Sequence, residues 1–156
     1  MRAWIAVAVA LGVAGCEFAP PAPPPELNRA ECYTVDVFDA RHARRKILAP
    51  GPDVQPAWAA FSGVWGQGAW NGGQCHEIHV TQIFPDGSAV VLDTVAPFDG
   101  LRASAFRRPA TLTQDGRLVL ISDGTRREYR IEDGVMYGTR TDGRGRTAQV
   151  ILTPQS

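Results

Sequence analysis

One short run of residues carries several side chains that could bind a metal ion, Cys75-His76-Glu77-Ile78-His79. In an extended strand, Cys75, Glu77 and His79 project to one face, whereas His76 and Ile78 project to the other. A Glu-x-His pair can share one ion, but a structural zinc site takes four ligands and a catalytic one takes three and a water. No histidine follows His79 in the sequence. We therefore interpret the run as ordinary outward-facing polar residues, with no metal.

Patterns that would indicate catalysis are missing from the sequence. It has no Gly-x-Ser-x-Gly elbow, no Cys–His pair free for nucleophilic attack and no phosphate-binding glycine loop. Carboxylates are numerous, but many belong to Asp-Gly pairs, where turn formation explains them. The formal net charge is zero, which gives no basic field for a nucleic acid. We predict no enzymatic activity, no cofactor and no nucleic-acid partner.

The first cysteine of the sequence, Cys16, ends a segment with the composition of an export signal. Arg2 precedes an apolar run over residues 3–14, which is shorter than the roughly 20 residues that span a bilayer. Val13-Ala14-Gly15-Cys16 resembles the bacterial lipobox. The resemblance implies that residues 1–15 are a signal peptide, and that Cys16 becomes the acylated N-terminus, anchored stably by its chains.

The residues after Cys16 predict a location and a spacer. Glu17 stands where an aspartate commonly marks retention in the inner membrane, so we expect an outer-membrane anchor with the domain in the periplasm. Residues 16–25 include the run Pro20-Pro21-Ala22-Pro23-Pro24-Pro25. Such a run favours polyproline II and acts as a semi-rigid spacer. The membrane is thus an expected partner, through the lipid.

Two cysteines remain once Cys16 is lipidated. In an oxidising compartment, Cys32 and Cys75 are expected to form a disulfide. The bridge would pin the segment after the spacer to the body of the domain and contribute about 2 to 4 kcal/mol. Two free thiols or a metal site are the alternatives.

The chain from Phe61 onward is punctuated by Asx-Gly pairs, which favour type I′ hairpin turns because both residues tolerate a positive φ. The pairs begin at Asn71, Asp86, Asp99, Asp115, Asp123, Asp133 and Asp142. Between them we predict strands over residues 62–70, 75–84, 87–95, 101–113, 117–122, 125–132, 134–141 and 146–153. Arg127, Tyr129 and Ile131 alternate with Glu128, Arg130 and Glu132. The sequence therefore predicts an all-β domain over residues 61–156, a single antiparallel up-and-down barrel of about eight strands.

The start of this meander, Gly63-Val64-Trp65, resembles the Gly-x-Trp motif of the lipocalin and calycin family. The resemblance implies that Trp65 plugs the closed end of the barrel and that Gly63 allows close approach of the backbone. It also implies a late arginine stacked on Trp65, for which Arg140 and Arg146 are both candidates. The family's second motif, a Thr-Asp pair near a tyrosine, is not at the expected place.

A second tryptophan, Trp70, lies an odd number of residues after Trp65. On a regular strand the two rings would face opposite sides, but Gly66 and Gly68 between them are suited to a bulge that changes this. We interpret Trp70 as an aromatic residue at the rim or in the packing, or as one that stacks on a ligand at the mouth.

Residues 26–60 form an N-terminal extension with less regular patterning. Residues 32–38 alternate as a short strand would, and residues 54–61 suit a short helical turn. The basic run at residues 41–46 is either a solvated surface or a contact with anionic lipid headgroups, at about 1 kcal/mol per charge.

Two functions fit this organisation. In the first, the anchored barrel binds an apolar or amphipathic ligand; in the second, a packed barrel docks an envelope protein or inhibits an enzyme. Gly73-Gln74-Cys75 faintly resembles periplasmic metalloprotease inhibitors, although their second cysteine lies later in the barrel. A cavity above about 300 Å³ would favour the ligand, and a filled core with an exposed apolar patch would favour the partner. Expected inward residues are Ile78, Val80, Val90, Leu92, Leu118, Leu120, Tyr129, Ile131, Met136 and Val150.

Overall fold

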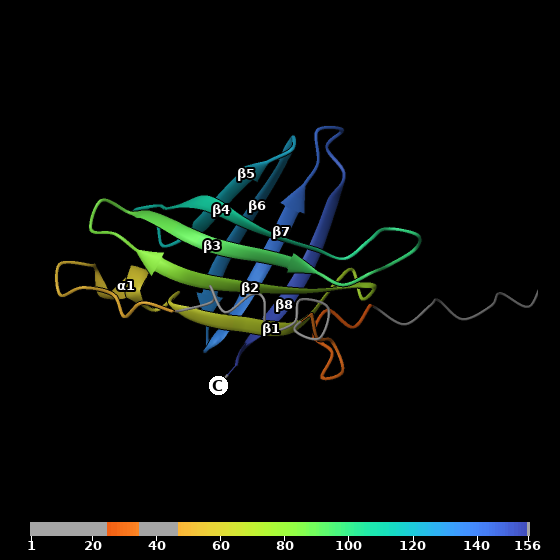
Figure 1. Ribbon diagram of the computed structural model, residues 1–156, viewed down its shortest axis with the longest axis horizontal. Coiled ribbons are helices and arrows are strands. Elements are labelled where there is room, and N and C mark those ends of the chain that lie inside the picture. Colours follow the sequence, from red (N-terminus) through yellow and green to blue (C-terminus); the bar gives the residue numbers. More distant parts are fainter. Residues whose placement is uncertain (1–24, 35–46, 156) are drawn as a thin grey trace, which may run out of the picture.

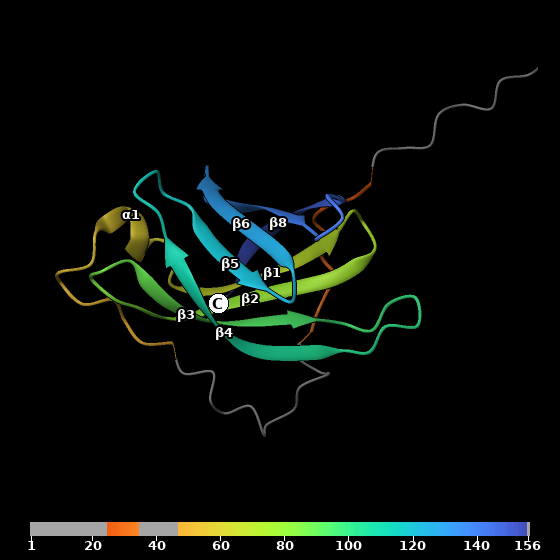
Figure 2. The same cartoon turned by 90° about the horizontal axis from the view of Figure 1, so that it is seen from above.

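The computed structural model describes residues 25–34 and 47–155, and its dominant feature is a closed antiparallel barrel (Figures 1 and 2). Each strand pairs with the next in the chain, and the last pairs with the first. The predicted all-β meander is confirmed. The elements are α1 (Pro56–Ala59), β1 (Gly63–Trp70), β2 (Gln74–Ile83), β3 (Ser88–Val95), β4 (Ser104–Leu112), β5 (Leu118–Ser122), β6 (Thr125–Glu132), β7 (Val135–Thr141) and β8 (Thr147–Gln155). In this part of the chain, no helix is long and apolar enough to cross a bilayer.

Tight Asp-Gly turns join two of the strand pairs in the predicted way, β5–β6 and β6–β7, and a third forms the tip of the longer β3–β4 connection. Asp99, Asp123 and Asp133 have φ values of 46°, 51° and 51°, and the glycine after each also has a positive φ. A residue other than glycine rarely adopts this conformation, and aspartate tolerates it better than most. The turn chemistry in the sequence therefore fixes where these strands reverse.

A β-bulge in β1 decides which way the two tryptophans of that strand point. Trp65 pairs with Ile78 and Gly68 pairs with His76, so two residues of β1 lie opposite one residue of β2. Gln67 in the bulge has a φ of 59°. The extra residue reverses the alternation, and Trp65 and Trp70 therefore both belong to the buried core.

The end of the barrel next to α1 is closed by aromatic side chains. The indole N–H of Trp65 donates to the carbonyl of Phe61 over 2.9 Å, and that of Trp58 in α1 donates to the carbonyl of Thr113 over 3.0 Å. These bonds hold the helix across the opening between β2–β3 and β4–β5. We call this the closed end, in agreement with the expected short helical turn over residues 54–61.

The interior beyond this plug is filled by side chains. Seven of the expected inward residues are in the buried core: Ile78, Val80, Leu118, Leu120, Tyr129, Met136 and Val150. Ile131 packs against it. Val90 and Leu92 do not point inward as expected, because β3 turns Ala89 and Val91 into the core instead. The parity is set by the pairing of Val91 with the inward Val80.

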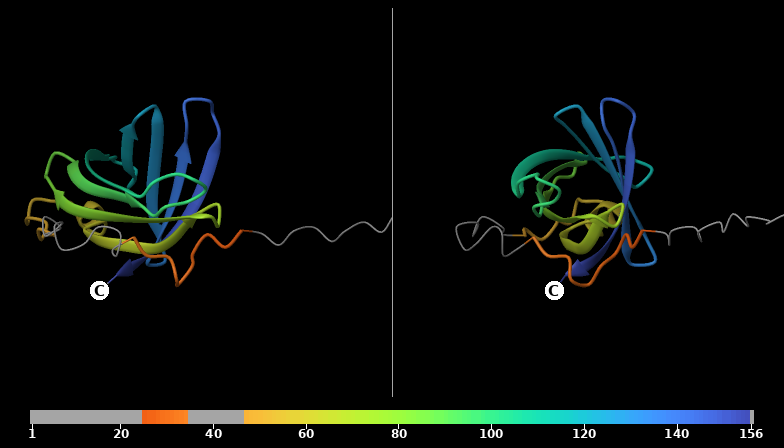
Figure 3. Two further views of the ribbon diagram at one scale, coloured as in Figure 1. Left: turned by 45° about the vertical axis from the view of Figure 1, so that its right-hand side comes forward. Right: turned by 90° about the vertical axis from the view of Figure 1, so that its right-hand side faces the viewer.

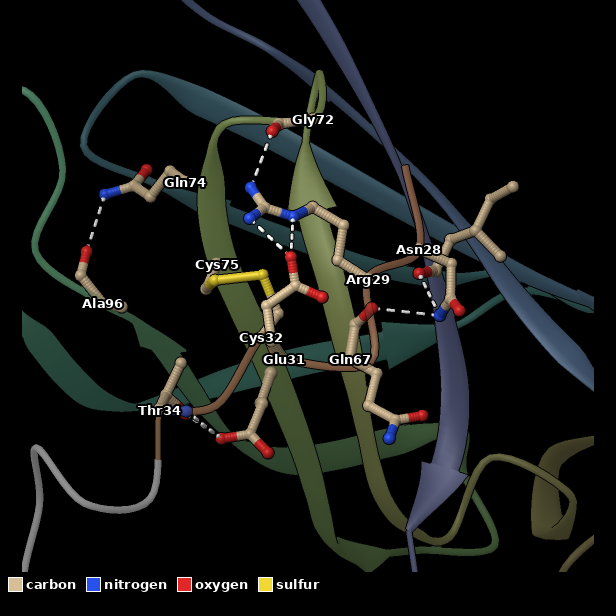
Figure 4. The surroundings of a disulfide bond; sticks show 12 residues. Asn28, Arg29, Glu31, Cys32, Thr34, Gln67, Gly72, Gln74, Cys75 and Ala96 are labelled. Atoms are coloured by element: carbon tan, nitrogen blue, oxygen red, sulfur yellow. Dashed lines mark hydrogen bonds and ion pairs between the residues drawn. A yellow bond between two sulfur atoms is a disulfide. The ribbon is translucent and has the colours of Figure 1, made fainter. Parts of the chain in front are cut away.

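Residues 25–34, which we call the N-terminal strap, run along the outside of β1 and β2 and are bonded to them by the Cys32–Cys75 disulfide (Figures 3 and 4). The predicted pairing is therefore present. Direct pairing of β1 with β8 covers only Val64 to Gly66. Beyond it, the carbonyl of Leu27 accepts hydrogen bonds from the N–H groups of Ala69 in β1 and Ile151 in β8. The strap thus completes the barrel at its seam.

Some expectations fall outside the described residues. They are the signal peptide, Cys16, the linker up to residue 24, and the basic run at 41–46. The expected strand over residues 32–38 is described only at 32–34, which form no strand.

Candidate binding site at the mouth of the barrel

The end of the barrel opposite α1 is polar, and we call it the mouth. It is bounded by the β1–β2, β3–β4, β5–β6 and β7–β8 connections, at residues 71–73, 96–103, 123–124 and 142–146. A pocket of about 350 Å³ opens here. Its lining contains three arginines, one carboxylate, three other polar side chains and one alanine: Asn71, Thr125, Arg127, Arg140, Asp142, Arg146, Thr147 and Ala148.

Two of these arginines form a cross-strand pair. Arg127 of β6 lies directly opposite Arg140 of β7 in the sheet register. Such partners have Cβ atoms about 4.5 to 5.5 Å apart, and like charges in this relation destabilise a sheet. Burial is the main cause that lowers the pKa of Arg140, and the positive charge of the neighbouring Arg127 lowers it further. Because an arginine nevertheless stays protonated in proteins, the pair concentrates positive charge at the pocket.

One buried carboxylate partly balances this charge. Asp93 of β3 lies inside the barrel, with its Oδ2 atom 3.4 Å from Nε of Arg108 and 3.7 Å from Nε of Arg127. Arg108 also pairs with Asp123 at the rim over 2.9 Å. Among the described residues, no carboxylate forms an ion pair with Arg140, whose Nη1 donates only a long hydrogen bond of 3.4 Å to the Gln74 side chain. Positive charge therefore remains in excess on the Arg127–Arg140 side.

Beneath the arginines, His76 joins the strands through a buried hydrogen-bond network. Its Nδ1 lies 2.8 Å from the carbonyl oxygen of Thr94, and its Nε2 lies 2.9 Å from the hydroxyl of Tyr129. A carbonyl only accepts, so Nδ1 carries the proton, and Nε2 of the neutral ring accepts from the Tyr129 hydroxyl. Burial lowers the pKa of His76 to about 4 although Asp93 is nearby, and burial likewise raises the pKa of Tyr129 well above its usual value. The His76–Tyr129 pair at the floor of the mouth is therefore uncharged at neutral pH.

Trp70 forms one wall between this floor and the arginines. Its ring centroid lies 5.0 Å from that of His76, and the guanidinium carbon of Arg140 lies 4.9 Å from the Trp70 centroid. The indole N–H of Trp70 is buried without an acceptor among the described residues. A buried donor left unpaired costs about 1 to 3 kcal/mol.

The structure separates the sequence-predicted site residues between the two ends of the barrel. Trp65 is part of the closed-end plug, and Gly63 begins β1 beside it with a φ of 127°. Trp70 is near the mouth, but it is only 3% exposed and is a wall residue rather than a rim residue. Arg140, one of the two arginines expected to stack on Trp65, stacks on Trp70 instead.

The Cys75–His79 run is divided between the two faces of β2 as expected. Glu77 faces out but is buried, with its Oε2 accepting from the backbone N–H of Thr34 over 2.9 Å and also from the Thr34 hydroxyl. His76 is not an outward-facing polar residue, because it belongs to the interior network. In the described ranges, no three His, Cys, Asp or Glu residues are grouped as a metal site would need.

Sequence reasoning missed the arginine pair, although a signal for it was present. Arg127 shares a face with Tyr129 and Ile131, which were expected to point inward, so Arg127 had to point inward as well. Arg140 lies four residues after Met136 on the next strand, so it shares the inward face with Met136. The signal is weak because a charged residue near a strand end is usually solvated.

No protein-family model matches this chain, and neither the curated proteins nor the solved structures contain a significant match to it. The function proposed below therefore rests on the chemistry of the residues at the mouth.

Proposed function

We propose that this protein is a lipid-anchored barrel of the bacterial cell envelope that binds a small anion, or the anionic end of an amphipathic ligand, at its mouth. The observation that supports this most is the Arg127–Arg140 cross-strand pair, which lines a pocket of about 350 Å³. A phosphate or carboxylate placed between two guanidinium groups would accept charge-assisted hydrogen bonds from both and offset their repulsion.

The size of the pocket and the filled core below it define how a ligand would fit. Tyr129 and the core residues beneath it are fully buried, so side chains occupy the barrel axis below the mouth. This disfavours a wholly apolar ligand and favours a compact anionic group held in the polar mouth. The pocket of about 350 Å³ exceeds the size at which we expected a ligand, whereas the filled core and the exposed Phe98 and Leu101 meet the criterion for the alternative, a packed barrel that docks an envelope protein or inhibits an enzyme.

Anion binding can be tested with inorganic phosphate and the mature chain, residues 16–156 with C16S. Phosphate should raise the midpoint of thermal unfolding at constant ionic strength, following mass action, whereas the same concentration of chloride should not. It should also change tryptophan fluorescence in the parent and in Trp65→Phe but not in Trp70→Phe, because Trp70 is the ring beside Arg140. No shift with phosphate, citrate or sulfate would contradict the proposal.

The envelope anchor is tested separately by Cys16→Ser in the full chain. If Cys16 is the lipidated residue, the variant should accumulate as an unprocessed and unacylated precursor. Normal processing with continued membrane attachment would mean that the anchor lies elsewhere.

A further inference from the structure

We infer that the mouth of the barrel faces the bilayer that holds the anchor, and that the anion it binds is the phosphate of an anionic lipid headgroup. This inference rests on the proposed anion site and names the source of its ligand. Three independent observations support it: where the chain enters the barrel, which apolar side chains surround the mouth, and how charge is distributed there.

The described chain starts at the mouth. A Cβ atom added to Gly72 in the β1–β2 connection would lie 3.0 Å from Cβ of Pro25, so the strap begins in contact with that turn. Nη1 of Arg29 donates to the carbonyl of Gly72 over 3.1 Å and holds the strap there (Figure 4). In Figure 1 the strap and the β3–β4 hairpin tip both lie on the right, opposite α1.

The length of chain between Cys16 and Pro25 limits where a bilayer can be. Nine residues span at most about 30 Å when fully extended. The strands are themselves seven to ten residues long in most cases, or roughly 23 to 33 Å at about 3.3 Å per residue. The closed end lies a further strand length beyond the point where the tether joins the domain, so the mouth can contact the bilayer with a much less extended tether than the closed end can.

Apolar side chains gather at the same end. Phe98 and Leu101 flank the Asp99-Gly100 turn of the β3–β4 connection and are 45% and 61% exposed. The ring of Phe98 covers Gly73, because an added Cβ there would come within 2.7 Å of it. The hairpin tip and the β1–β2 turn thus form one surface, which we call the apolar platform. Exposed phenylalanine and leucine side chains beside arginines are typical of proteins that rest on a membrane interface.

Charge at the mouth complements an anionic bilayer. The pocket lining carries Arg127, Arg140 and Arg146 against Asp142, which pairs with Arg146 over 2.7 Å. Asp93, Asp99, Asp123 and Glu26, which lies beside Gly72, are further carboxylates at this end, and Arg102, Arg108 and Arg144 add positive charge. Each arginine close to an anionic surface strengthens binding by roughly fivefold, the equivalent of about 1 kcal/mol. Headgroup phosphates beneath the platform would therefore be attracted to Arg140, the member of the arginine pair that forms no ion pair with a carboxylate of the described residues.

The test uses the mature chain, residues 16–156, coupled through the Cys16 thiol to a maleimide lipid in vesicles, because Cys32 and Cys75 are already joined. Amide hydrogen exchange is compared between phosphatidylcholine vesicles and vesicles that also contain phosphatidylglycerol. With phosphatidylglycerol, exchange at residues 98–103 and 142–146 should slow at least fivefold. The turns at residues 114–116 and 133–134, at the closed end, should not change.

Two pairs of variants complete the test. Leu101→Asp should abolish the protection, whereas Phe84→Asp, at an exposed apolar residue (37%) of the β2–β3 connection at the closed end, should leave it intact. Arg140→Gln should reduce protection at 142–146 at least fivefold relative to Arg126→Gln. Equal protection of both ends, no protection, or protection insensitive to Leu101→Asp or Arg140→Gln would overturn the inference. Binding of free phosphate without vesicles is a separate measurement, so the proposed anion site can survive that failure.

Discussion

The guanidinium group of Arg140 lies over the indole ring of Trp70, with 4.9 Å between the guanidinium carbon and the ring centroid. The lipocalin resemblance implied an arginine on Trp65, at the closed end. Here the stacked pair is at the mouth, and the Trp65 indole is held by the carbonyl of Phe61 instead. A cation–π contact of this kind orients the guanidinium without using its N–H groups, so those not bonded to Gln74 can bind an anion.

Burial predicts that both tryptophans matter for stability. Trp65→Ala and Trp70→Ala should each lower the free energy of unfolding by about 3 to 5 kcal/mol, because each removes a large core side chain. The rim interpretation of Trp70 implied a much smaller loss. Chemical unfolding followed by circular dichroism checks this, with Trp70→Phe as the milder control. A loss below about 1 kcal/mol for Trp70→Ala would show that this ring is not part of the core.

The fold could be predicted because its determinants are local. Asp-Gly turns such as Asp123-Gly124 and the alternation around Tyr129 specify strand ends and faces without knowledge of distant residues. The facing of Trp70 depended on whether the bulge at Gln67 formed, which the sequence left open. Pairing decided it, because Gly68 had to match His76 for the interior to fill. The arginine pair was harder still, since two strands must close in register before Arg127 meets Arg140.

His76 should make stability depend on pH between about 4 and 6.5. Burial lowers the pKa of the folded ring to about 4, below the 6.5 of an ordinary histidine, so the unfolded chain binds more protons in this range. Stability should therefore fall as the pH decreases from 6.5 towards 4, by roughly 3 kcal/mol from this residue. His76→Gln should have a flatter pH profile in urea unfolding. Parallel profiles for the two proteins would contradict the buried, neutral histidine.

Gly138 allows the ring of Tyr129 to lie across the barrel. A Cβ atom at this position would approach Cδ1 and Cε1 of Tyr129 to 2.8 Å and Cγ1 of Val150 to 2.7 Å. Gly138→Ala should thus destabilise the protein by about 1 to 3 kcal/mol through overpacking. Gly143→Ala, in the β7–β8 turn with no contact closer than 3.5 Å, is the matched control and should change stability by less than about 0.5 kcal/mol. Equal effects of the two alanines would argue against a tightly packed interior.

The disulfide should stabilise the seam between β1 and β8. Replacing Cys32 and Cys75 with serine should lower the free energy of unfolding by about 2 to 4 kcal/mol, the usual range for a loop of this kind. Because Leu27 bridges the two strands, the amides of Ala69 and Ile151 should exchange faster in this variant. Exchange of the Val91 amide in β3 should change only by the amount that the loss of global stability accounts for. Unchanged exchange at Ala69 would mean that the strap holds without the bridge.

The central claim, that the arginine pair is an anion site, is tested most directly by isothermal titration calorimetry of inorganic phosphate into the mature chain and two variants. Arg140→Gln removes a pocket arginine, whereas Arg126→Gln removes the neighbouring outward arginine, which pairs with Glu128 on the surface. We predict saturable binding to the parent and to Arg126→Gln, with affinity at least tenfold weaker in Arg140→Gln. Equal affinity in all three proteins, or no binding to the parent, would contradict the account.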